Sequence, residues 1–243
     1  MCQIIWHTGI VRTTLELDDE GRGATTSGPK RILVYGVTGS GKTTLARRIG
    51  EVTGLPWHSV DDEIGWLPDW VERPREDQRD LASRIAASDE WVLDTAFGHW
   101  RDIVMLRTEL IVALDYPRLL SLGRLLLRTA RRIVTPELAC NGNRESLRQA
   151  LSSHSIVVWH FRSFSHKRER IAAWQADPSA PPVVRLRSAR MTEEWLTALR
   201  DRHWLVHSAS TGYSLSLFGR PGDFADPRSS ALTSATGRQV MVR

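Results

Sequence analysis

A nine-residue stretch near the start of the chain, from Gly36 to Thr44, constrains this protein more than any other feature. It reads GVTGSGKTT and fits the pattern G-x-x-x-x-G-K-[ST], with Gly36, Gly41, Lys42 and Thr43 at the fixed positions. The glycines at 36, 39 and 41 let successive backbone N–H groups turn toward one anion, in conformations that a Cβ would obstruct. We therefore expect this stretch to bind phosphate.

The residues on either side of this loop support that prediction. An apolar run over 31–35 is typical of a buried strand, and apolar residues at 45, 46 and 49 have helical spacing. The phosphate would then lie at a helix N-terminus, where free N–H groups and the helix dipole favour an anion. Lys42 is expected to act in catalysis on the β- and γ-phosphates, and the Thr43 hydroxyl to bind Mg²⁺. The predicted cofactor-binding residues are Gly36, Thr38, Gly39, Ser40, Gly41, Lys42, Thr43 and Thr44.

The core of the chain, over about 30–207, alternates short apolar runs with helical stretches. The apolar runs cover 32–35, 57–60, 91–93, 110–114 and 183–186, and the expected helices cover 43–53, 75–87, 117–134, one or two within 143–174, and 192–203. Strands that alternate with helices form a parallel sheet covered on both faces. The predicted fold class is α/β, with three layers and a five-stranded parallel sheet.

Composition restricts the setting in which this domain works. The chain has 243 residues and 41% hydrophobic residues, enough for one α/β domain between a flexible leader (1–29) and a disordered tail (208–243). The two cysteines, and the absence of a long apolar run or a secretory signal, favour a cytoplasmic protein without membrane contact. The net charge of +5 is compatible with either nucleic acid or a nucleotide as partner.

Further motifs follow the loop. Asp62 opens the pattern D-x-x-x-W-x-P-x-W, a second run reads WVLD and ends at Asp94, and a third reads LDYPR. Together with the glycine loop, these motifs resemble the adenylate-kinase-related P-loop proteins labelled DNA topology modulation proteins, over about residues 31–200. The resemblance implies a nucleoside-monophosphate-kinase-like P-loop NTPase fold that binds ATP and Mg²⁺, with an undefined phosphoryl acceptor. In place of the family's Gly-Asn-Tyr, this chain has Thr95-Ala96-Phe97, which leaves acceptor specificity open.

Two carboxylates follow apolar runs at the edge of the sheet where ligands bind in open α/β folds. Asp94 is predicted to hold Mg²⁺, directly or through water, with a turn or helix cap as the alternative. Asp62 is a candidate catalytic residue that would orient the acceptor, with a plain turn as the alternative. Asp61 precedes it, and the spacing to Trp66 favours Asp62 as the residue that faces the site.

Arginines cluster at 124, 128, 131 and 132 on the helix expected over 117–134. We predict that Arg128 and Arg132 are catalytic, because a pair four residues apart can straddle one phosphate. They would belong to a lid-like region over about 124–146 that closes on the phosphates. A solvated basic face or a nucleic-acid patch would give the same pattern.

Two other groups of residues are ambiguous in the sequence. Trp66 and Trp70 either stack on a substrate base or cover an edge of the core. The histidines at 154, 160 and 166 lack the i, i+4 spacing of a helical metal site, so no role is assigned to them.

The predicted function is that of a small-molecule or nucleotide kinase that transfers the γ-phosphoryl group of ATP with Mg²⁺ to an unidentified small acceptor. Two alternatives remain: a non-catalytic nucleotide-dependent switch or nucleic-acid-binding regulator, and a simple ATPase. The sequence distinguishes neither ATP from GTP nor one oligomeric state from another.

Overall fold

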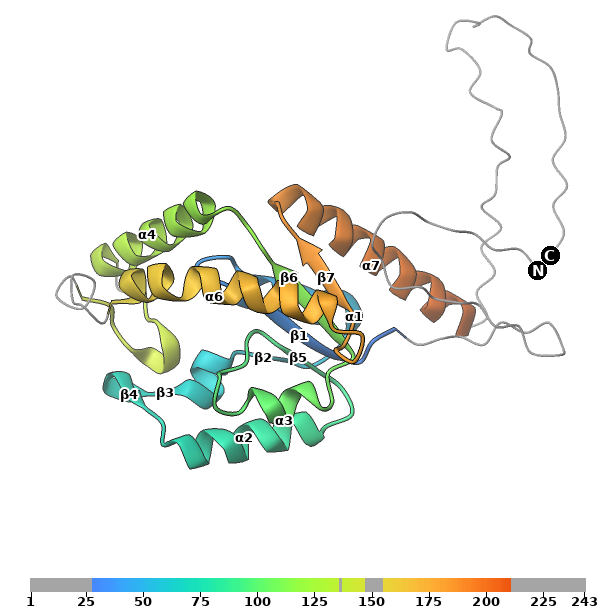
Figure 1. Cartoon of the computed structure of the whole chain (residues 1–243), viewed down its shortest axis with the longest axis horizontal. Coiled ribbons are helices and arrows are strands. Elements are labelled where there is room, and N and C mark those ends of the chain that lie inside the picture. The colour runs from blue at the N-terminus through green and yellow to red at the C-terminus, as the bar shows by residue number, and fades with distance from the viewer. Residues whose placement is uncertain (1–27, 136, 147–154, 211–243) are drawn as a thin grey trace, which may run out of the picture.

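A parallel five-stranded sheet forms the centre of the protein. The computed structural model describes residues 28–135, 137–146 and 155–210, without the side chains of 202–210. The strands lie in the order β2 (Trp57–His58), β5 (Trp91–Leu93), β1 (Arg31–Gly36), β6 (Leu110–Leu114) and β7 (Val183–Leu186). All four neighbouring pairs are parallel, so each connection crosses a face of the sheet. The predicted α/β class and parallel sheet are confirmed (Figure 1).

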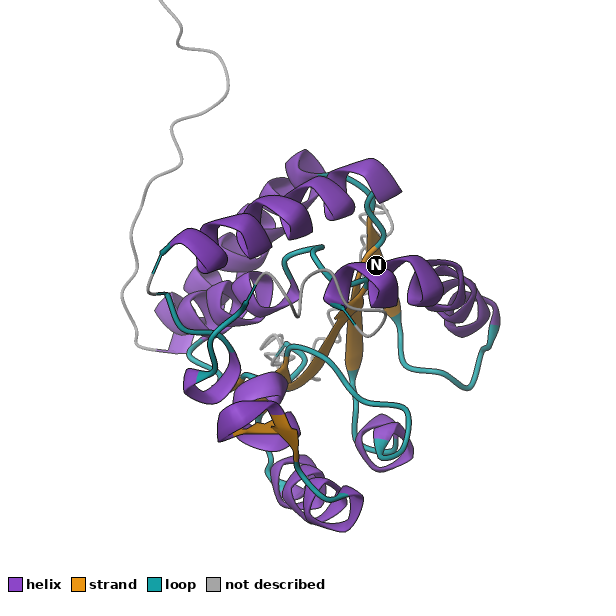
Figure 2. Cartoon of the chain, turned by 90° about the vertical axis from the view of Figure 1, so that its left-hand side faces the viewer, coloured by secondary structure: helices purple, strands orange, loops and turns teal. Residues whose placement is uncertain are grey.

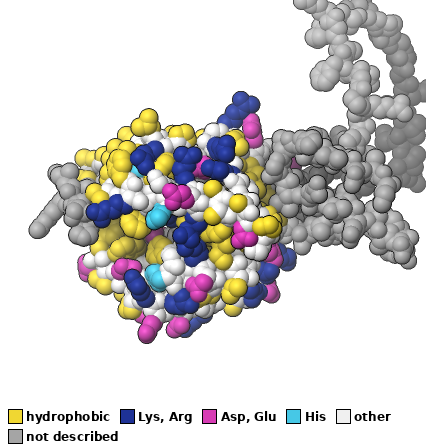
Figure 3. Space-filling view, in the orientation of Figure 1, with side chains coloured by type: hydrophobic (Ala, Val, Ile, Leu, Met, Phe, Trp, Pro, Cys, Tyr) yellow, Lys and Arg dark blue, Asp and Glu magenta, His cyan; other side chains and the backbone are white. Residues whose placement is uncertain are grey.

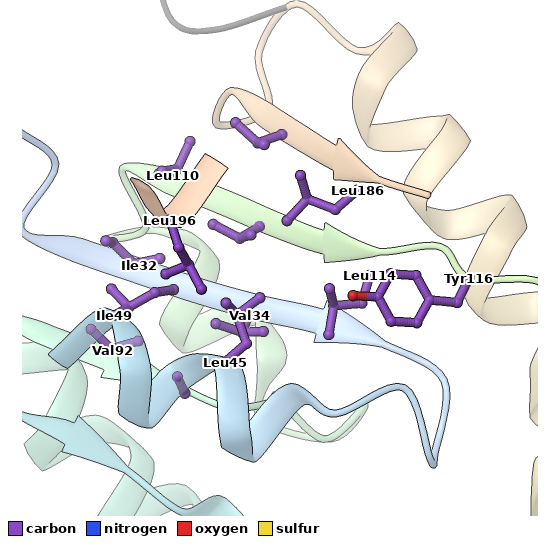
Figure 4. Packing of buried hydrophobic residues seen from close by; sticks show 13 residues of the cluster. Ile32, Val34, Leu45, Ile49, Val92, Leu110, Leu114, Tyr116, Leu186 and Leu196 are labelled. Carbon is purple, nitrogen blue, oxygen red and sulfur yellow. The ribbon is translucent and has the colours of Figure 1, made fainter. Parts of the chain in front are cut away.

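Alternate residues of β1 face two different hydrophobic layers. Ile32 and Val34 pack toward α1 (Lys42–Thr53) and α7 (Ala189–Ser210), as Figure 4 shows for α1. Leu33 and Tyr35 face the opposite layer, because successive side chains of a strand point to opposite faces. That layer contains α2 (Arg75–Ala87), α3 (Arg101–Met105) and α6 (Ile156–Ala176). Figure 2 shows helices on both sides of the sheet.

Most of the expected helices have the bounds that the sequence indicates. Helices α1, α2 and α4 (Arg118–Val134) agree within one residue, whereas α7 extends beyond 192–203 at both ends. The expected leader lies mostly, and the tail from residue 211 entirely, outside the described residues, and so does 147–154. None of the described helices is long and apolar enough to cross a membrane.

The expected strand over 57–60 ends at His58. The Val60 N–H donates to Asp94 Oδ1 (2.9 Å). Directly after Val60 the chain forms a π-helical turn, η1 (Asp61–Gly65). A small hairpin follows, with β3 (Trp66–Leu67) and β4 (Val71–Glu72) around the 3₁₀ turn η2 (Pro68–Trp70). We call residues 61–72 the hairpin segment. The sequence did not predict this segment as regular structure, because two-residue strands give no periodic signal.

Candidate functional site

The glycine loop is pressed against α4. Gly39 and Gly41 have φ of 82° and 92°, in the left-handed region that glycine adopts without strain. A Cβ on Gly39 would lie 2.3 Å from the backbone oxygen of Ser121 and 2.9 Å from the Cβ of Leu125. Glycine is therefore needed at position 39 for two reasons, the backbone conformation and the close approach of another helix.

One carbonyl holds the loop in shape. The oxygen of Val37 accepts hydrogen bonds from Ser40 N (3.2 Å), Ser40 Oγ (2.8 Å) and Lys42 Nζ (3.1 Å). Burial lowers the pKa of Lys42, and the nearby carboxylates of Asp94 and Asp61 oppose that shift. The loop joins the central strand β1 to α1, as its sequence requires. The chain has a P-loop NTPase-like fold.

Thr43 and Asp94 meet at the start of α1. Thr43 Oγ1 donates to Asp94 Oδ2 at 2.5 Å, while Asp94 Oδ1 accepts from Val60 N. Asp94 is 2% exposed, and burial raises the pKa of its carboxyl group, against the hydrogen bond from Thr43. A hydroxyl beside a carboxylate offers the hard oxygen ligands that Mg²⁺ takes in phosphate sites, where phosphates and water complete the shell. The described residues contain no group of three or more acidic, His or Cys side chains arranged for a metal. Thr43 and Asp94 offer two oxygen ligands, which fits a Mg²⁺ site whose other ligands are phosphate and water.

The adjacent acids Asp61 and Asp62 have different partners. Asp62 accepts hydrogen bonds from the Ser59 hydroxyl and from Asn141 N, the latter at 2.8 Å. Asp61 instead lies within electrostatic reach of Lys42, Arg128 and Lys167. Burial raises the pKa of Asp61, and these three cations oppose the shift. The geometry brings Asp61 to the loop, whereas Asp62 joins two loops together.

The arginines of α4 also differ from one another in their partners. Arg128 lies within electrostatic reach of Lys42, and its pKa is lowered by burial and then by the neighbouring Arg132. Arg132 pairs with Glu145 at 3.2 Å. Arg124 stacks over the ring of Tyr116 (5.2 Å to the centroid), and its Nη1 lies 4.0 Å from where a Cβ on Gly41 would stand. Arg124 and Arg128 therefore flank the loop.

Helix α6 supplies two residues that the sequence reasoning missed. His160 is fully buried, and its Nδ1 lies 3.0 Å from the carbonyl oxygen of Thr38 in the loop. Since a carbonyl only accepts, Nδ1 carries the proton. Lys167 lies within electrostatic reach of Lys42 and Asp61. Neither residue has a local sequence signal. Each comes to the loop because α6, which is more than a hundred residues after the loop in the sequence, packs beside it.

Residues 137–146 bind the hairpin segment, and we call them the clasp loop. Asn143 Oδ1 accepts from Trp70 N at 2.7 Å, and Asn143 Nδ2 donates to Leu67 O at 2.9 Å. Asn141 Nδ2 donates to Trp66 O at 3.0 Å, and Trp70 Nε1 donates to the backbone oxygen of Arg144 at 2.9 Å. Trp66 and Trp70 contact each other edge to face, at 5.7 Å between ring centroids. These tryptophans lie where the two segments join.

Comparison with known proteins gives limited likenesses. No family model matches the chain. It is 39% identical over 66 residues to the ATP-dependent protease ATPase subunit ClpY of Bacillus pumilus and 38% identical over 65 residues to HslU of Staphylococcus carnosus. These matches cover 26% and 25% of the chain but only 14% of each relative.

Three solved kinases are similar at low identity. A gluconokinase from Sinorhizobium meliloti is 16% identical with a TM-score of 0.42, over 76% of this chain and 98% of that one. Shikimate kinase from Bacteroides thetaiotaomicron is 17% identical with a TM-score of 0.43, over 72% and 98%. Shikimate kinase from Acinetobacter baumannii, in complex with shikimate, is 16% identical with a TM-score of 0.44, over 76% and 94%. The assignment of the fold rests on the sheet and loop described above.

Proposed function

We propose that this protein is a kinase that binds ATP and Mg²⁺ at residues 36–44 and transfers the γ-phosphoryl group to the hydroxyl of a small acceptor. The observation that carries the proposal is the chain of contacts from Thr43 through Asp94 to Val60, the residue before Asp61. These contacts join the phosphate loop directly to the turn that contains Asp61, a partly buried acid. A loop that only bound nucleotide would need no such acid beside Lys42.

The residues of the chain divide the work of phosphoryl transfer. An acceptor oxygen forms a bond to the γ-phosphorus while the bond between that phosphorus and the bridging oxygen of ADP breaks. Asp61 takes the proton of the acceptor hydroxyl, and ADP leaves with the electron pair of the broken bond. Lys42, Arg124 and Arg128 stabilise the charge that spreads over the phosphoryl oxygens. Mg²⁺, when held by Thr43 and Asp94, would offset the charge of the β- and γ-phosphates.

The test is transfer of label from γ-labelled ATP to a panel of nucleotides and hydroxylated metabolites. Lys42→Ala should lower transfer by a factor on the order of 10³, because it removes a cation that acts on the transferred group. Lys30→Ala is the matched control, since this exposed lysine pairs with Glu90. The proposal would be contradicted if both variants lost ATP binding and turnover to the same extent, or if neither variant lost them.

A second candidate function is ATP hydrolysis without an acceptor. It is favoured by the local identity to ClpY and HslU, which are ATPase subunits by name. Phosphate release at full rate in the absence of every panel compound would support this candidate. A nucleic-acid-binding regulator would instead bind DNA or RNA with a steep dependence on salt and would transfer no label.

A further inference from the structure

Three basic side chains gather around Tyr35, the residue before the phosphate loop. The ammonium of Lys167 lies 4.5 Å from the centroid of the Tyr35 ring. Burial raises the pKa of the Tyr35 hydroxyl, and Arg101 and Arg170 lie near enough to that hydroxyl to oppose the shift. Two of these residues come from α6 and one from the first position of α3. We call Arg101, Lys167 and Arg170 the cation group.

The positive charge of this group is only partly balanced. Burial lowers the pKa of Lys167 to about 7, with further lowering by Lys42 and Arg101. Burial and then Arg170 lower the pKa of Arg101. Asp61 opposes the shift at Lys167 and Asp102 opposes the shift at Arg101, but Asp102 is already paired with Arg79 at 3.1 Å.

When several cations lie close together in a partly buried site, repulsion and desolvation make their charged forms less stable. An anion bound between the cations offsets that loss of stability. Guanidinium groups are suited to such an anion, because each presents several N–H donors in a planar fork that matches an oxyanion. Contacts with Tyr35 use only some of those donors. The cation group therefore has the chemistry of an oxyanion site.

The cation group lies around Tyr35 and meets the phosphate loop where Lys167 comes within electrostatic reach of Lys42. The phosphate loop leads into α1, which packs on the face of the sheet that contains Ile32 and Val34. The side chain of Tyr35 packs on the other face, with Ile111 and with Ile171 of α6. In Figure 1, α6 crosses this second face, and the view in Figure 3 shows basic side chains on the same side of the molecule. The link between the two places is Asp61, which is within electrostatic reach of both Lys42 and Lys167.

We propose that Arg101, Lys167 and Arg170 bind an oxyanion, a carboxylate or a phosphate, that the phosphoryl acceptor carries in addition to its reacting hydroxyl. The inference rests on the proposed kinase function. With the anion held here, the hydroxyl of a small acceptor is directed toward Asp61 and the end of the phosphate loop. The site selects acidic acceptors over neutral ones of the same size.

The test first fills the phosphate loop with saturating MgADP and then titrates inorganic phosphate and, separately, acetate by calorimetry. The wild type should bind at least one of the two anions, and the stronger one identifies the preferred oxyanion. Arg170→Gln should weaken that binding by at least tenfold, because it removes one charged donor from a site with three. Arg162→Gln, an exposed arginine on the same helix, is the matched control and should leave binding unchanged.

Lys167→Gln provides a second variant in case Arg170→Gln alters the fold, which thermal unfolding would reveal. Equal anion affinity in the wild type and in both variants would overturn the proposal, and so would no anion binding by the wild type. In either case the three cations would only attach α6 to the sheet.

Failure of the kinase proposal has a different signature. It would appear as loss of the MgADP signal itself, or as an MgADP affinity that Lys42→Ala does not change. The anion titration can be repeated without nucleotide on Lys42→Ala, so the cation group is tested in either case.

Discussion

The donor side and the acceptor side of the proposed kinase site are built in opposite ways. The donor side is one continuous stretch, residues 36–44, with Asp94 as its main contribution from elsewhere. The acceptor side collects Asp61, Arg101 and Lys167 from three separate elements. A contiguous site is specified by local backbone conformation, whereas a dispersed one depends on how helices pack. The comparison implies that the two sides can be altered independently.

The sharpest test of that independence is the pair Asp61→Asn and Asp62→Asn. Removal of the acid that takes the acceptor proton should lower the turnover number by a factor on the order of 10² to 10³. Asp62→Asn should change the turnover number less than about threefold, because the Asp62 carboxylate is engaged with Ser59 and Asn141. Transfer kinetics would be measured with the acceptor found in the panel, and ATP affinity should stay constant in both variants. A larger loss for Asp62→Asn would restore the assignment that the sequence favours.

The next test asks whether the donor side is as local as it looks. Gly39→Ala and Gly54→Ala place the same side chain at φ of 82° and 75°. At Gly54 nothing lies within 4 Å of the new Cβ, so the cost is the strain alone, about 1 kcal/mol. At Gly39 the collision with Ser121 should raise the loss in free energy of unfolding to on the order of 3 kcal/mol. Urea denaturation measures both, and equal losses would mean that α4 does not constrain the loop.

A smaller effect on nucleotide binding is expected at His160, a residue of α6 that contacts the phosphate loop. His160→Ala should weaken MgATP binding about fivefold, since it removes one hydrogen bond, worth about 1 kcal/mol, that fixes the Thr38 peptide. His160→Asn retains a donor near the position of Nδ1 and should restore most of the affinity. Calorimetry distinguishes this positioning role from simple packing, because a packing residue would not be rescued by the more polar Asn.

The smallest change concerns charge alone. The pKa of Lys167 is lowered to about 7, whereas that of Lys30 is raised by its hydrogen bond to Glu90. Amine labelling followed by mass spectrometry should therefore show Lys167 becoming reactive near pH 7 and Lys30 only at strongly alkaline pH. Addition of phosphate should shift the Lys167 midpoint upward, because a bound anion favours the charged form. Identical pH profiles for the two lysines would show that Lys167 is not desolvated.

The sign of the linked stability change follows from the same pKa. In the unfolded chain Lys167 keeps its proton up to the ordinary lysine pKa of 10.5, whereas in the folded protein it releases the proton near pH 7. The unfolded state therefore binds more protons between these values, so the contribution of Lys167 to the free energy of unfolding rises with pH across that window. Lys167→Met should remove this slope, as thermal unfolding at a series of pH values would measure.

The predictions from sequence succeeded where the signal is local. The apolar runs of β1, β5 and β6 are continuous because both faces of a parallel sheet are buried, whereas β7 contains Arg185. The predicted bounds of these four strands agree with the structure within one residue. The hairpin segment and α3 were missed, since their two-residue strands and short helical turns have too few positions to show a period. The similarly short β5 was found because it is an uninterrupted apolar run. The roles predicted for Arg132 and Asp62 stay predictions, and in the structure both residues are engaged with the clasp loop.

The sequence by itself determined the donor loop, because the glycines, Lys42 and Thr43 act through backbone conformations that neighbouring residues set. It also determined the parallel sheet, through the alternation of buried runs with amphipathic helices. Only the tertiary structure distinguished Asp61 from Asp62, brought Lys167 and His160 to the loop, and brought Arg101 to Tyr35. The physical reason is that long-range electrostatics and helix packing depend on distances between segments, and sequence spacing does not encode those distances.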